Sequence, residues 1–290
     1  MRFQCQHCQA INQIGDDLLG VEFACGRCQQ AIQGPAGPQE PGVVYGDFVL
    51  GQVHIKRTRE VDFHAQQISL QRPAVVKLFT PDLAADDEFM NRVLAACRQA
   101  AACSHPGLCP IYTVGREDGM FYLARDTGCA LDLKQSLLRD GALTWQEGAR
   151  AITDVARALD HAWQHKQLSH GNLKPDYILY DRLAGCQLVD VGLAGLDPDP
   201  DRERIIGTPQ YLSPERIVGQ PVDLQADLYS LGICFFFSIT GEFPFVAEST
   251  DEIVRKHLND FPRPANQVVQ DVPPAICSVI DTLLEKNPDD

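Results

Sequence analysis

The chain has 290 residues, of which 44% are hydrophobic, enough to fill one large core or two unequal ones. Its 25 Lys and Arg residues face 39 Asp and Glu residues, and the formal net charge of −14 disfavours nonspecific binding to nucleic acid or to an anionic membrane. We therefore expect proteins as partners of this chain.

The sequence also argues against secretion and against a membrane span. No apolar run follows the first basic residue, so no secretory signal is recognisable. The longest strongly apolar run, 231–240, is about half as long as a membrane span. The 11 cysteines are an odd number, and most are scattered, so reduced thiols fit better than a disulfide framework. We expect a cytoplasmic chain without a membrane segment.

A composition break divides the chain near its N-terminus. Glycine and proline recur in QGPAGPQEPG, and no apolar periodicity survives there, which predicts a linker at 34–44. The linker separates a segment of residues 1–33 from a large domain of residues 45–290. A segment of about thirty residues cannot build a core without a metal or a disulfide.

Two C-x-x-C pairs lie in this first segment. Cys5 and Cys8 form one pair, and Cys25 and Cys28 form the other, sixteen residues later. This spacing is typical of zinc ribbons, in which four thiolates hold one structural Zn²⁺. Two disulfides or a redox dithiol are the alternatives, and both fit a reducing compartment less well. We predict a metal site formed by these four cysteines.

The charge of the ribbon bears on its partners. Residues 1–33 contain two arginines and three acidic residues, a net charge of −1. A nucleic-acid-binding ribbon is expected to carry a basic surface, which is absent here. The sequence therefore favours a structural or protein-docking ribbon over one that binds nucleic acid.

The large domain begins with strand patterns. Short β-like runs occur at 45–50, 73–79 and 120–124. Between the second and third runs, apolar residues from Phe89 to Cys97 recur at three- and four-residue spacing, which predicts one helix. This part of the chain should form a small strand-rich lobe.

Helical patterns dominate from residue 144 onward. The segment TWQE at 144–147 has the spacing of a capping box and should begin a helix. Residues 227–240 are apolar on every side, as in a helix buried within a domain, and Gly241 is placed to end it. A larger helical lobe should therefore follow the strand-rich one.

Six segments in order resemble the landmarks of bacterial serine/threonine protein kinases. They are AVVK ending at Lys77, SHPGLCPIY at 104–112, HGNLKPDY at 170–177, VDVGLA with Asp190, GTPQYLSPE at 207–215 and ADLYSLG at 226–232. The resemblance implies an α+β, bilobal protein-kinase-like fold, with a β-rich N-lobe at about 45–125 and a helical C-lobe at about 126–290. It also implies ATP and Mg²⁺ as cofactors.

The resemblance stops at KNPDD, where the family continues into a final helix. We expect that helix to be missing from this sequence. Glu215, which an arginine of that helix would pair in the family, is then expected to lack this partner.

The catalytic loop departs from the family pattern. The family's H-R-D is replaced by His170, Gly171 and Asn172. An amide can orient a hydroxyl group but cannot accept its proton, as the carboxylate of an active kinase does. Tyr177 stands where the family has the asparagine that holds a second magnesium ion. We expect no catalytic residue in this loop.

Two candidates remain for nucleotide and metal binding, Lys77 and Asp190. In the family, a glutamate on the helix that follows holds this lysine, but the matching position is Ala96, and residues 89–103 contain no acid. Lys77 is expected to lean on Asp190 or to be solvated. Asp190 either coordinates one magnesium ion or anchors the start of the activation segment.

The glycine-rich loop of the family should fall between residues 51 and 62, and only Gly51 remains of it. Lys56, Arg57 and Arg59 could supply charge to a phosphate, although a solvated basic turn is the simpler interpretation. Arg125 is expected at the position that gates the adenine pocket.

Three functions are open at this point. The first is a pseudokinase, a non-catalytic signalling or scaffold module that binds protein partners. The second is a weak or unconventional serine/threonine kinase that uses Lys77, Asp190 and one magnesium ion. The third is a nucleic-acid adaptor built on the ribbon, which the acidic composition disfavours.

Overall fold

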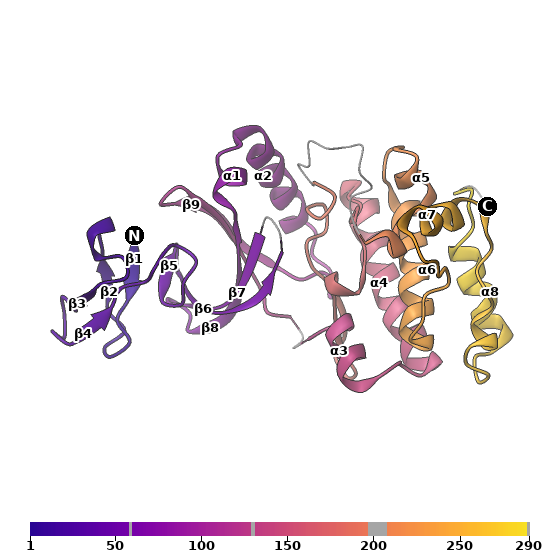
Figure 1. Cartoon of the computed structure of the whole chain (residues 1–290), viewed down its shortest axis with the longest axis horizontal. Helices are drawn as coiled ribbons and strands as arrows, with labels where there is room; N and C mark the ends of the chain where they lie inside the picture. The colour runs from indigo at the N-terminus through magenta and orange to yellow at the C-terminus, as the bar shows by residue number, and fades with distance from the viewer. Residues whose placement is uncertain (58–59, 129–130, 197–207, 289–290) are drawn as a thin grey trace. The chain divides into compact units, whose positions relative to one another are not determined.

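The computed structural model describes the whole chain except residues 58–59, 129–130, 197–207 and 289–290. It divides into two compact units (Figure 1). Residues 1–94 and 110–127 form a strand-rich unit, and residues 95–109 and 128–290 form a helical unit. The predicted sequence of a strand-rich lobe followed by a helical lobe is confirmed.

An antiparallel sheet organises the strand-rich unit, with the strand order β2-β1-β5-β6-β7-β8-β10-β9. These strands are β1 (Arg2–Gln4), β2 (Ile11–Gln13), β5 (Val43–Tyr45), β6 (Phe48–Lys56), β7 (Glu60–Gln67), β8 (Arg72–Phe79), β9 (Ile111–Glu117) and β10 (Met120–Arg125). Strands β3 (Glu22–Ala24) and β4 (Ala31–Gln33) pair with each other, and η1 spans Asp16–Leu18. One apolar cluster joins side chains from both ends of the sheet, including Phe3, Tyr45 and Phe63.

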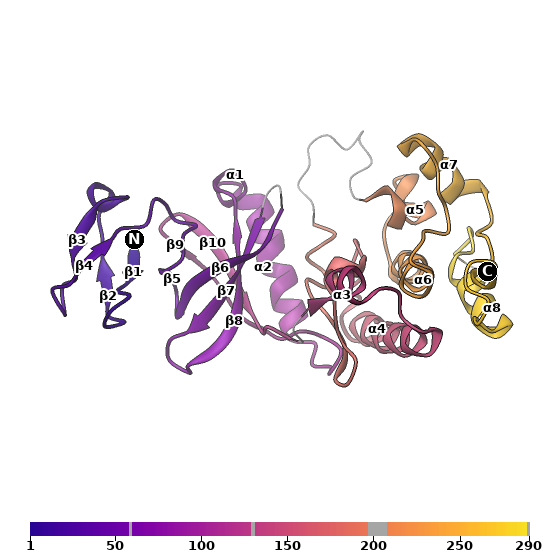
Figure 2. The same ribbon diagram turned by 60° about the horizontal axis from the view of Figure 1, so that its bottom comes forward.

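Two helices follow β8, as the turned view in Figure 2 also shows. They are α1 (Pro81–Ala84) and α2 (Asp87–Ala101). The side chain of Asp86 accepts a hydrogen bond from the backbone N–H of Phe89 at 2.9 Å, which satisfies a free amide of the first turn of α2. Phe89, Met90 and Val93 are buried, so the predicted amphipathic helix is present.

The helical unit contains the small sheet β11-β12-β13 and several helices. Its elements are β11 (Leu131–Asp132), α3 (Leu133–Asp140), α4 (Trp145–Lys166), η2 (Pro175–Tyr177), β12 (Ile178–Asp181), β13 (Gly185–Leu188), η3 (Pro209–Tyr211), α5 (Pro214–Ile217), α6 (Leu224–Thr240), α7 (Thr250–Asn259), η4 (Ala265–Gln267) and α8 (Pro274–Leu283). None of the described helices is both long enough and apolar enough to cross a membrane.

The ends of α4 and α6 follow the expected capping chemistry. Thr144 and Glu147 form both hydrogen bonds of a capping box at the start of α4. Helix α6 begins three residues before the expected Asp227, because the Asp223 side chain caps the amides of its first turn. Gly241 adopts a left-handed φ of 73° and ends α6, as predicted.

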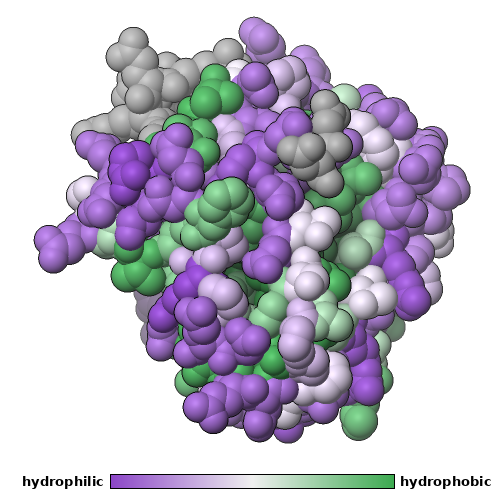
Figure 3. Space-filling model, turned by 90° about the vertical axis from the view of Figure 1, so that its right-hand side faces the viewer, coloured by the Kyte–Doolittle hydropathy of each residue, from purple (hydrophilic) through white to green (hydrophobic). Residues whose placement is uncertain are grey.

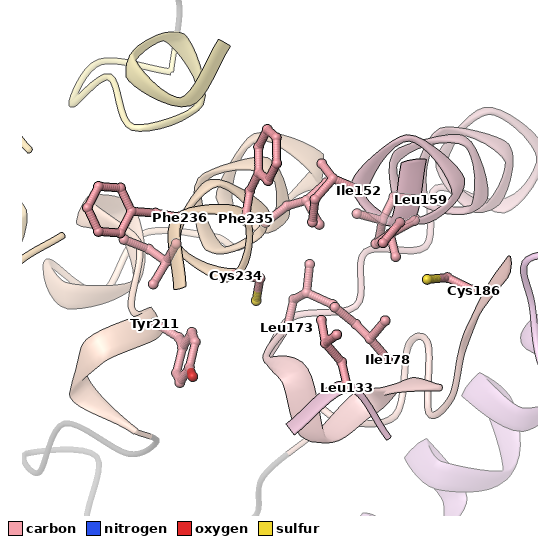
Figure 4. Close-up of a cluster of buried hydrophobic side chains, with 14 of the residues drawn as sticks. Leu133, Ile152, Leu159, Leu173, Ile178, Cys186, Tyr211, Cys234, Phe235 and Phe236 are labelled. Carbon is pink, nitrogen blue, oxygen red and sulfur yellow. The ribbon is translucent and has the colours of Figure 1, made fainter. Parts of the chain in front are cut away.

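The core of the helical unit lies around α4 and α6 (Figure 4). Ile152 of α4 lies beside Phe235 of α6 in this cluster. The two helices approach closely at Gly148, where a Cβ atom would lie 2.3 Å from a side-chain methyl carbon of Ile239. Asp227 of α6 accepts hydrogen bonds from the His170 and Gly171 amides, so α6 positions the loop that precedes η2. The end of the unit that carries α7 and α8 shows apolar residues interspersed among hydrophilic ones (Figure 3).

Candidate functional site

The four cysteines of the predicted ribbon converge in the structure. The sulfur atoms of Cys5 and Cys28 are 3.7 Å apart, those of Cys8 and Cys25 are also 3.7 Å apart, and all four lie within 4.8 Å of one another. A tetrahedron with Zn–S bonds of about 2.3 Å has sulfur–sulfur edges of about 3.8 Å. The four cysteines are free rather than disulfide-bonded, so the donor set fits a tetrahedral thiolate-bound ion.

The two halves of this site have the same backbone geometry. In each, the amide of the residue after the second cysteine donates to the carbonyl of the first, from Gln9 to Cys5 at 2.9 Å and from Gln29 to Cys25 at 3.0 Å. Both glutamines have a left-handed φ, 59° and 60°. The repeated pattern F-x-C-x-x-C-Q at 3–9 and 23–29 is the sequence signal of this symmetry, which the spacing of the cysteines alone did not expose.

The ribbon continues into the main sheet. Strand β1 pairs with β5, with Arg2 opposite Val44 and Phe3 opposite Val43. The Arg2 guanidinium holds both carboxylate oxygens of Glu117, at 2.5 and 2.8 Å, and also donates to the carbonyl of Gly46 at 2.7 Å. Burial raises the pKa of Glu117, but Arg2 and the Gly46 amide outweigh that effect, and its pKa is lowered on balance. The predicted linker, 34–44, thus includes residues that already belong to β5.

His170 in the catalytic-loop segment is a structural residue. Its ring is completely buried, its Nε2 donates to the carbonyl of Val189 at 3.1 Å, and its Nδ1 accepts from the Asn172 amide at 3.3 Å. Burial lowers the pKa of His170 to about 4, so the ring is neutral. The carboxylate of Asp227 accepts the amides of both His170 and Gly171 and holds the loop against α6.

Gly171 occupies a position that admits no side chain. Its φ is 77°, and a Cβ atom would lie 2.9 Å from the Cα atom of Gly195. Arg216, from α5, instead donates a hydrogen bond to the carbonyl of Gly171. The family has an arginine at the position of Gly171. In this conformation, the close contact between Gly171 and Gly195 would exclude an arginine side chain there.

Asn172 and Tyr177 lie close to His170 in this unit. Asn172 is half-buried. Tyr177 is only 5% exposed, its ring centroid lies 5.1 Å from that of His170, and it packs in a small cluster with Leu179 and Val189. The ring of Tyr177 is thus part of the local core. It lies at the position where the kinase family has the asparagine that binds the second magnesium ion.

Asp190 adopts a left-handed φ of 59°, and its side chain is mostly buried. Its carbonyl accepts the amides of Leu193 and Ala194, both at 3.0 Å, which closes a tight turn directly after β13 and Val189. This backbone role fits an anchor of the segment that follows. The alternative role of Asp190, as a ligand of one magnesium ion, stays a prediction.

Lys77 is not solvated, contrary to one of the two expectations. It is 2% exposed, and its Nζ lies 2.7 Å from a carboxylate oxygen of Glu60 and 3.2 Å from one of Asp62. Both acids belong to β7, the strand next to β8 in the sheet. Ala96 lies buried on α2, which has acidic residues only in its first turn, so the described part of that helix offers Lys77 no carboxylate from residue 89 onward.

The expected glycine-rich loop is mostly strand. Residues 51–56 belong to β6, residues 60–62 belong to β7, and the two strands are paired. Arg57 is not a solvated turn residue, because its guanidinium lies 2.8 Å from Glu60 and 3.6 Å from Asp62. The expectation for Arg59 lies outside the described residues.

Comparison with known proteins places these features in a family. The protein kinase domain model matches residues 62–290. The chain is a member of the protein kinase domain family.

Its relatives are bacterial kinases. The chain is 29% identical over 259 residues to the serine/threonine-protein kinase PknB of Mycolicibacterium smegmatis, covering 86% of this chain and 40% of the relative. It is 30% identical over 227 residues to PrkC of Bacillus subtilis, covering 77% of this chain and 35% of the relative. The chain thus spans well under half of the length of these relatives.

A solved structure shows the same fold. The kinase domain of Mycobacterium tuberculosis PknI superposes with a TM-score of 0.67 at 23% sequence identity, over 86% of this chain and 92% of that domain. The bilobal kinase fold expected from the sequence is therefore confirmed.

Among the kinase landmarks, the structural ones have visible contacts. Asp227 holds the catalytic loop, and Ser213 caps α5 through the Arg216 amide. One carboxylate oxygen of Glu215 is buried and has no hydrogen-bond partner among the residues that the structure describes. The positions that would handle protons, phosphate and the second metal in a kinase carry Asn172, Lys77 and Tyr177 in the arrangements described above.

Proposed function

We propose that this kinase domain is a pseudokinase, a non-catalytic signalling or scaffold module that carries a structural zinc ribbon. The observation that carries the proposal is the catalytic loop. Asn172 replaces the carboxylate that would accept the substrate proton, and the buried ring of Tyr177 replaces the ligand of the second magnesium ion.

Each replacement removes a separate part of the chemistry. Losing a general base typically costs about 10²- to 10⁴-fold in rate. The phenol of Tyr177 lies in a packed apolar cluster, so restoring a metal ligand there also requires the loss of that packing. Lys77, the residue that would contact the nucleotide phosphates, is also paired with Glu60 and Asp62.

The four-cysteine cluster supports structural Zn²⁺ in this proposal. Zn²⁺ bound by four thiolates leaves no open coordination position, so it would stabilise the ribbon rather than act in catalysis. The ligands are Cys5, Cys8, Cys25 and Cys28.

Protein partners fit the proposed module best. The chain is acidic, with a net charge of −14, and the ribbon carries no basic surface in its sequence. Nucleic acid and membrane are therefore not proposed as partners of this chain.

The test is phosphate transfer from radiolabelled ATP with Mg²⁺, to the chain itself and to a general protein acceptor. We expect no transfer above the background of a Lys77→Met variant, in which the lysine that contacts the α- and β-phosphates of ATP in protein kinases is removed. Transfer that depends on Lys77 and on Asp190 would contradict the proposal and establish the weak-kinase alternative.

A further inference from the structure

Four charged side chains gather around Lys77 within the strand-rich unit. Asp62 of β7 is directly opposite Lys77 of β8 in the antiparallel register. Glu60 is two residues before Asp62, so both acids lie on the Lys77 face of the sheet. On the other side of β8, Arg125 of β10 is opposite Val75, two residues from Lys77, and lies on the same face. Arg57 completes the group from the end of β6.

The distances make this a connected ionic network. Glu60 lies 2.7 Å from Lys77 and 2.8 Å from Arg57. Asp62 lies 3.2 Å from Lys77 and 3.6 Å from both Arg57 and Arg125. The carboxylate of Asp62 is therefore the centre of the network, with a cation on each side.

Burial makes the network hard to disrupt. Asp62, Lys77 and Arg125 are 1%, 2% and 3% exposed. A buried charge that loses its partner costs several kcal/mol, so each cation needs a carboxylate close by. Of the two acids, only Glu60 is partly exposed, with 21% of its side-chain surface accessible to solvent.

The origin of the two acids matters for function. In an active kinase, the lysine contacts the α- and β-phosphates while a glutamate from a mobile helix holds it. Here, both carboxylates come from a strand whose position is fixed by the hydrogen-bond ladder with β8. They cannot withdraw as a helix can, so a phosphate must compete with them directly for the ammonium group.

We propose that Glu60 and Asp62 occupy Lys77 in place of nucleotide phosphates, so that strand β7 acts as a built-in inhibitor of polyphosphate binding. This proposal deepens the pseudokinase assignment and rests on it, because it concerns the same lysine. It predicts that the site regains affinity for a polyphosphate when the two carboxylates are neutralised without a change of shape.

The experiment compares the full zinc-loaded chain with a Glu60→Gln, Asp62→Asn double variant. Binding of inorganic pyrophosphate and of ATP with Mg²⁺ is measured by titration calorimetry. We expect no binding by the wild type at millimolar ligand, and at least a tenfold tighter dissociation constant for the double variant. Adding Lys77→Met to the double variant should remove the gain.

The matched control removes the same two charges elsewhere. Glu248 and Asp251 are exposed acids of the helical unit, and the pair Glu248→Gln, Asp251→Asn changes the net charge equally. This control should bind no better than the wild type. A gain of the same size in the control would show that net charge, rather than the Lys77 network, governs binding and would overturn the proposal.

The single Glu60→Gln variant covers the case in which the double variant unfolds. It keeps Asp62 as a partner for all three cations and should give a smaller gain of the same kind. Unchanged or weaker binding in a folded Glu60→Gln variant would overturn the proposal, because the carboxylate would then position the lysine rather than block it. Phosphate transfer is measured separately, so that the two failures can be told apart. Transfer by the wild type requires bound ATP and would overturn both the proposed function and this proposal, whereas an unchanged affinity in the folded carboxylate variants would overturn this proposal alone.

Discussion

Replacing Cys25 with serine should unfold the ribbon and release β1 from the main sheet. Zn²⁺ contributes about 10–16 kcal/mol to the folding of small thiolate sites, which is as much as the whole stability of a typical domain. The ribbon has few buried apolar side chains of its own besides Phe3, Ile14 and Ile32. Its fold therefore cannot survive the loss of a ligand.

The cost to the strand-rich unit follows from the contacts of β1. Phe3 is 2% exposed, and the burial of such a ring contributes about 1.5–3 kcal/mol. The ion pair of Arg2 with Glu117 is partly exposed and adds about 0.2–1 kcal/mol. We expect the unit to lose about 2–4 kcal/mol in all when β1 leaves.

Hydrogen exchange monitored by mass spectrometry is the assay. Peptides that cover β1 to β5 should lose protection in the Cys25→Ser variant, and the same should follow removal of Zn²⁺ by a chelator. Cys103→Ser is the matched control, since Cys103 is buried in the helical unit and should leave these peptides unchanged. Full protection of β1 and β5 in the Cys25→Ser variant would refute the reasoning.

Three further predictions test other parts of the account. Arg2→Ala should lower the stability of the zinc-loaded chain by about 1 kcal/mol in urea titrations. The loss should be smaller at a pH below the lowered pKa of Glu117, because that carboxylate is then protonated and no longer pairs with Arg2. An unchanged urea midpoint at pH 7 would contradict this. Gly171→Ala should destabilise the chain by about 1–3 kcal/mol in thermal melts, because its φ is 77° and backbone lies 2.9 Å from the new Cβ atom, and a neutral result would show that the loop relaxes freely. Burial lowers the pKa of His257 to about 4, below the unfolded value of about 6.5, so the unfolded state binds more protons at this residue and its contribution to stability should fall as pH drops from 6.5 toward 4, by up to about 3 kcal/mol. Urea midpoints whose pH dependence is the same in the wild type and in a His257→Gln variant would contradict it.

The metal cluster and the helix ends could be predicted because they depend on local chemistry. Two C-x-x-C pairs must bring four sulfurs together if a small ribbon is to fold at all. In the same way, Thr144 with Glu147 and Gly241 act on the backbone within a few residues. The landmarks of the kinase family fixed the larger arrangement.

The partner of Lys77 could not be found in this way. Glu60 and Asp62 fall in a stretch that the family resemblance assigns to a loop, whereas here they belong to β7. The alternation of Glu60, Val61 and Asp62 is the signal that was available, since period-two alternation places both acids on one face of a strand. Their contact with Lys77 depends on the register with β8, which the sequence does not state.

The attachment of the ribbon was missed for a related reason. The composition of residues 34–44 indicates a linker, yet the contact is made by β1 at the other end of the ribbon. Arg2 and Glu117 are far apart in the sequence, and neither belongs to a recognisable motif. Long-range pairs of this kind follow from the fold rather than from local patterns.

The central claim, that the domain has lost its handling of phosphate and metal, is tested most directly by thermal melting of the zinc-loaded chain with and without ATP and Mg²⁺. We predict no change of melting temperature at millimolar nucleotide. A ligand at 100 times its dissociation constant would stabilise the chain by about 2.7 kcal/mol. A magnesium-dependent rise in melting temperature that corresponds to a stabilisation of that size would contradict the account.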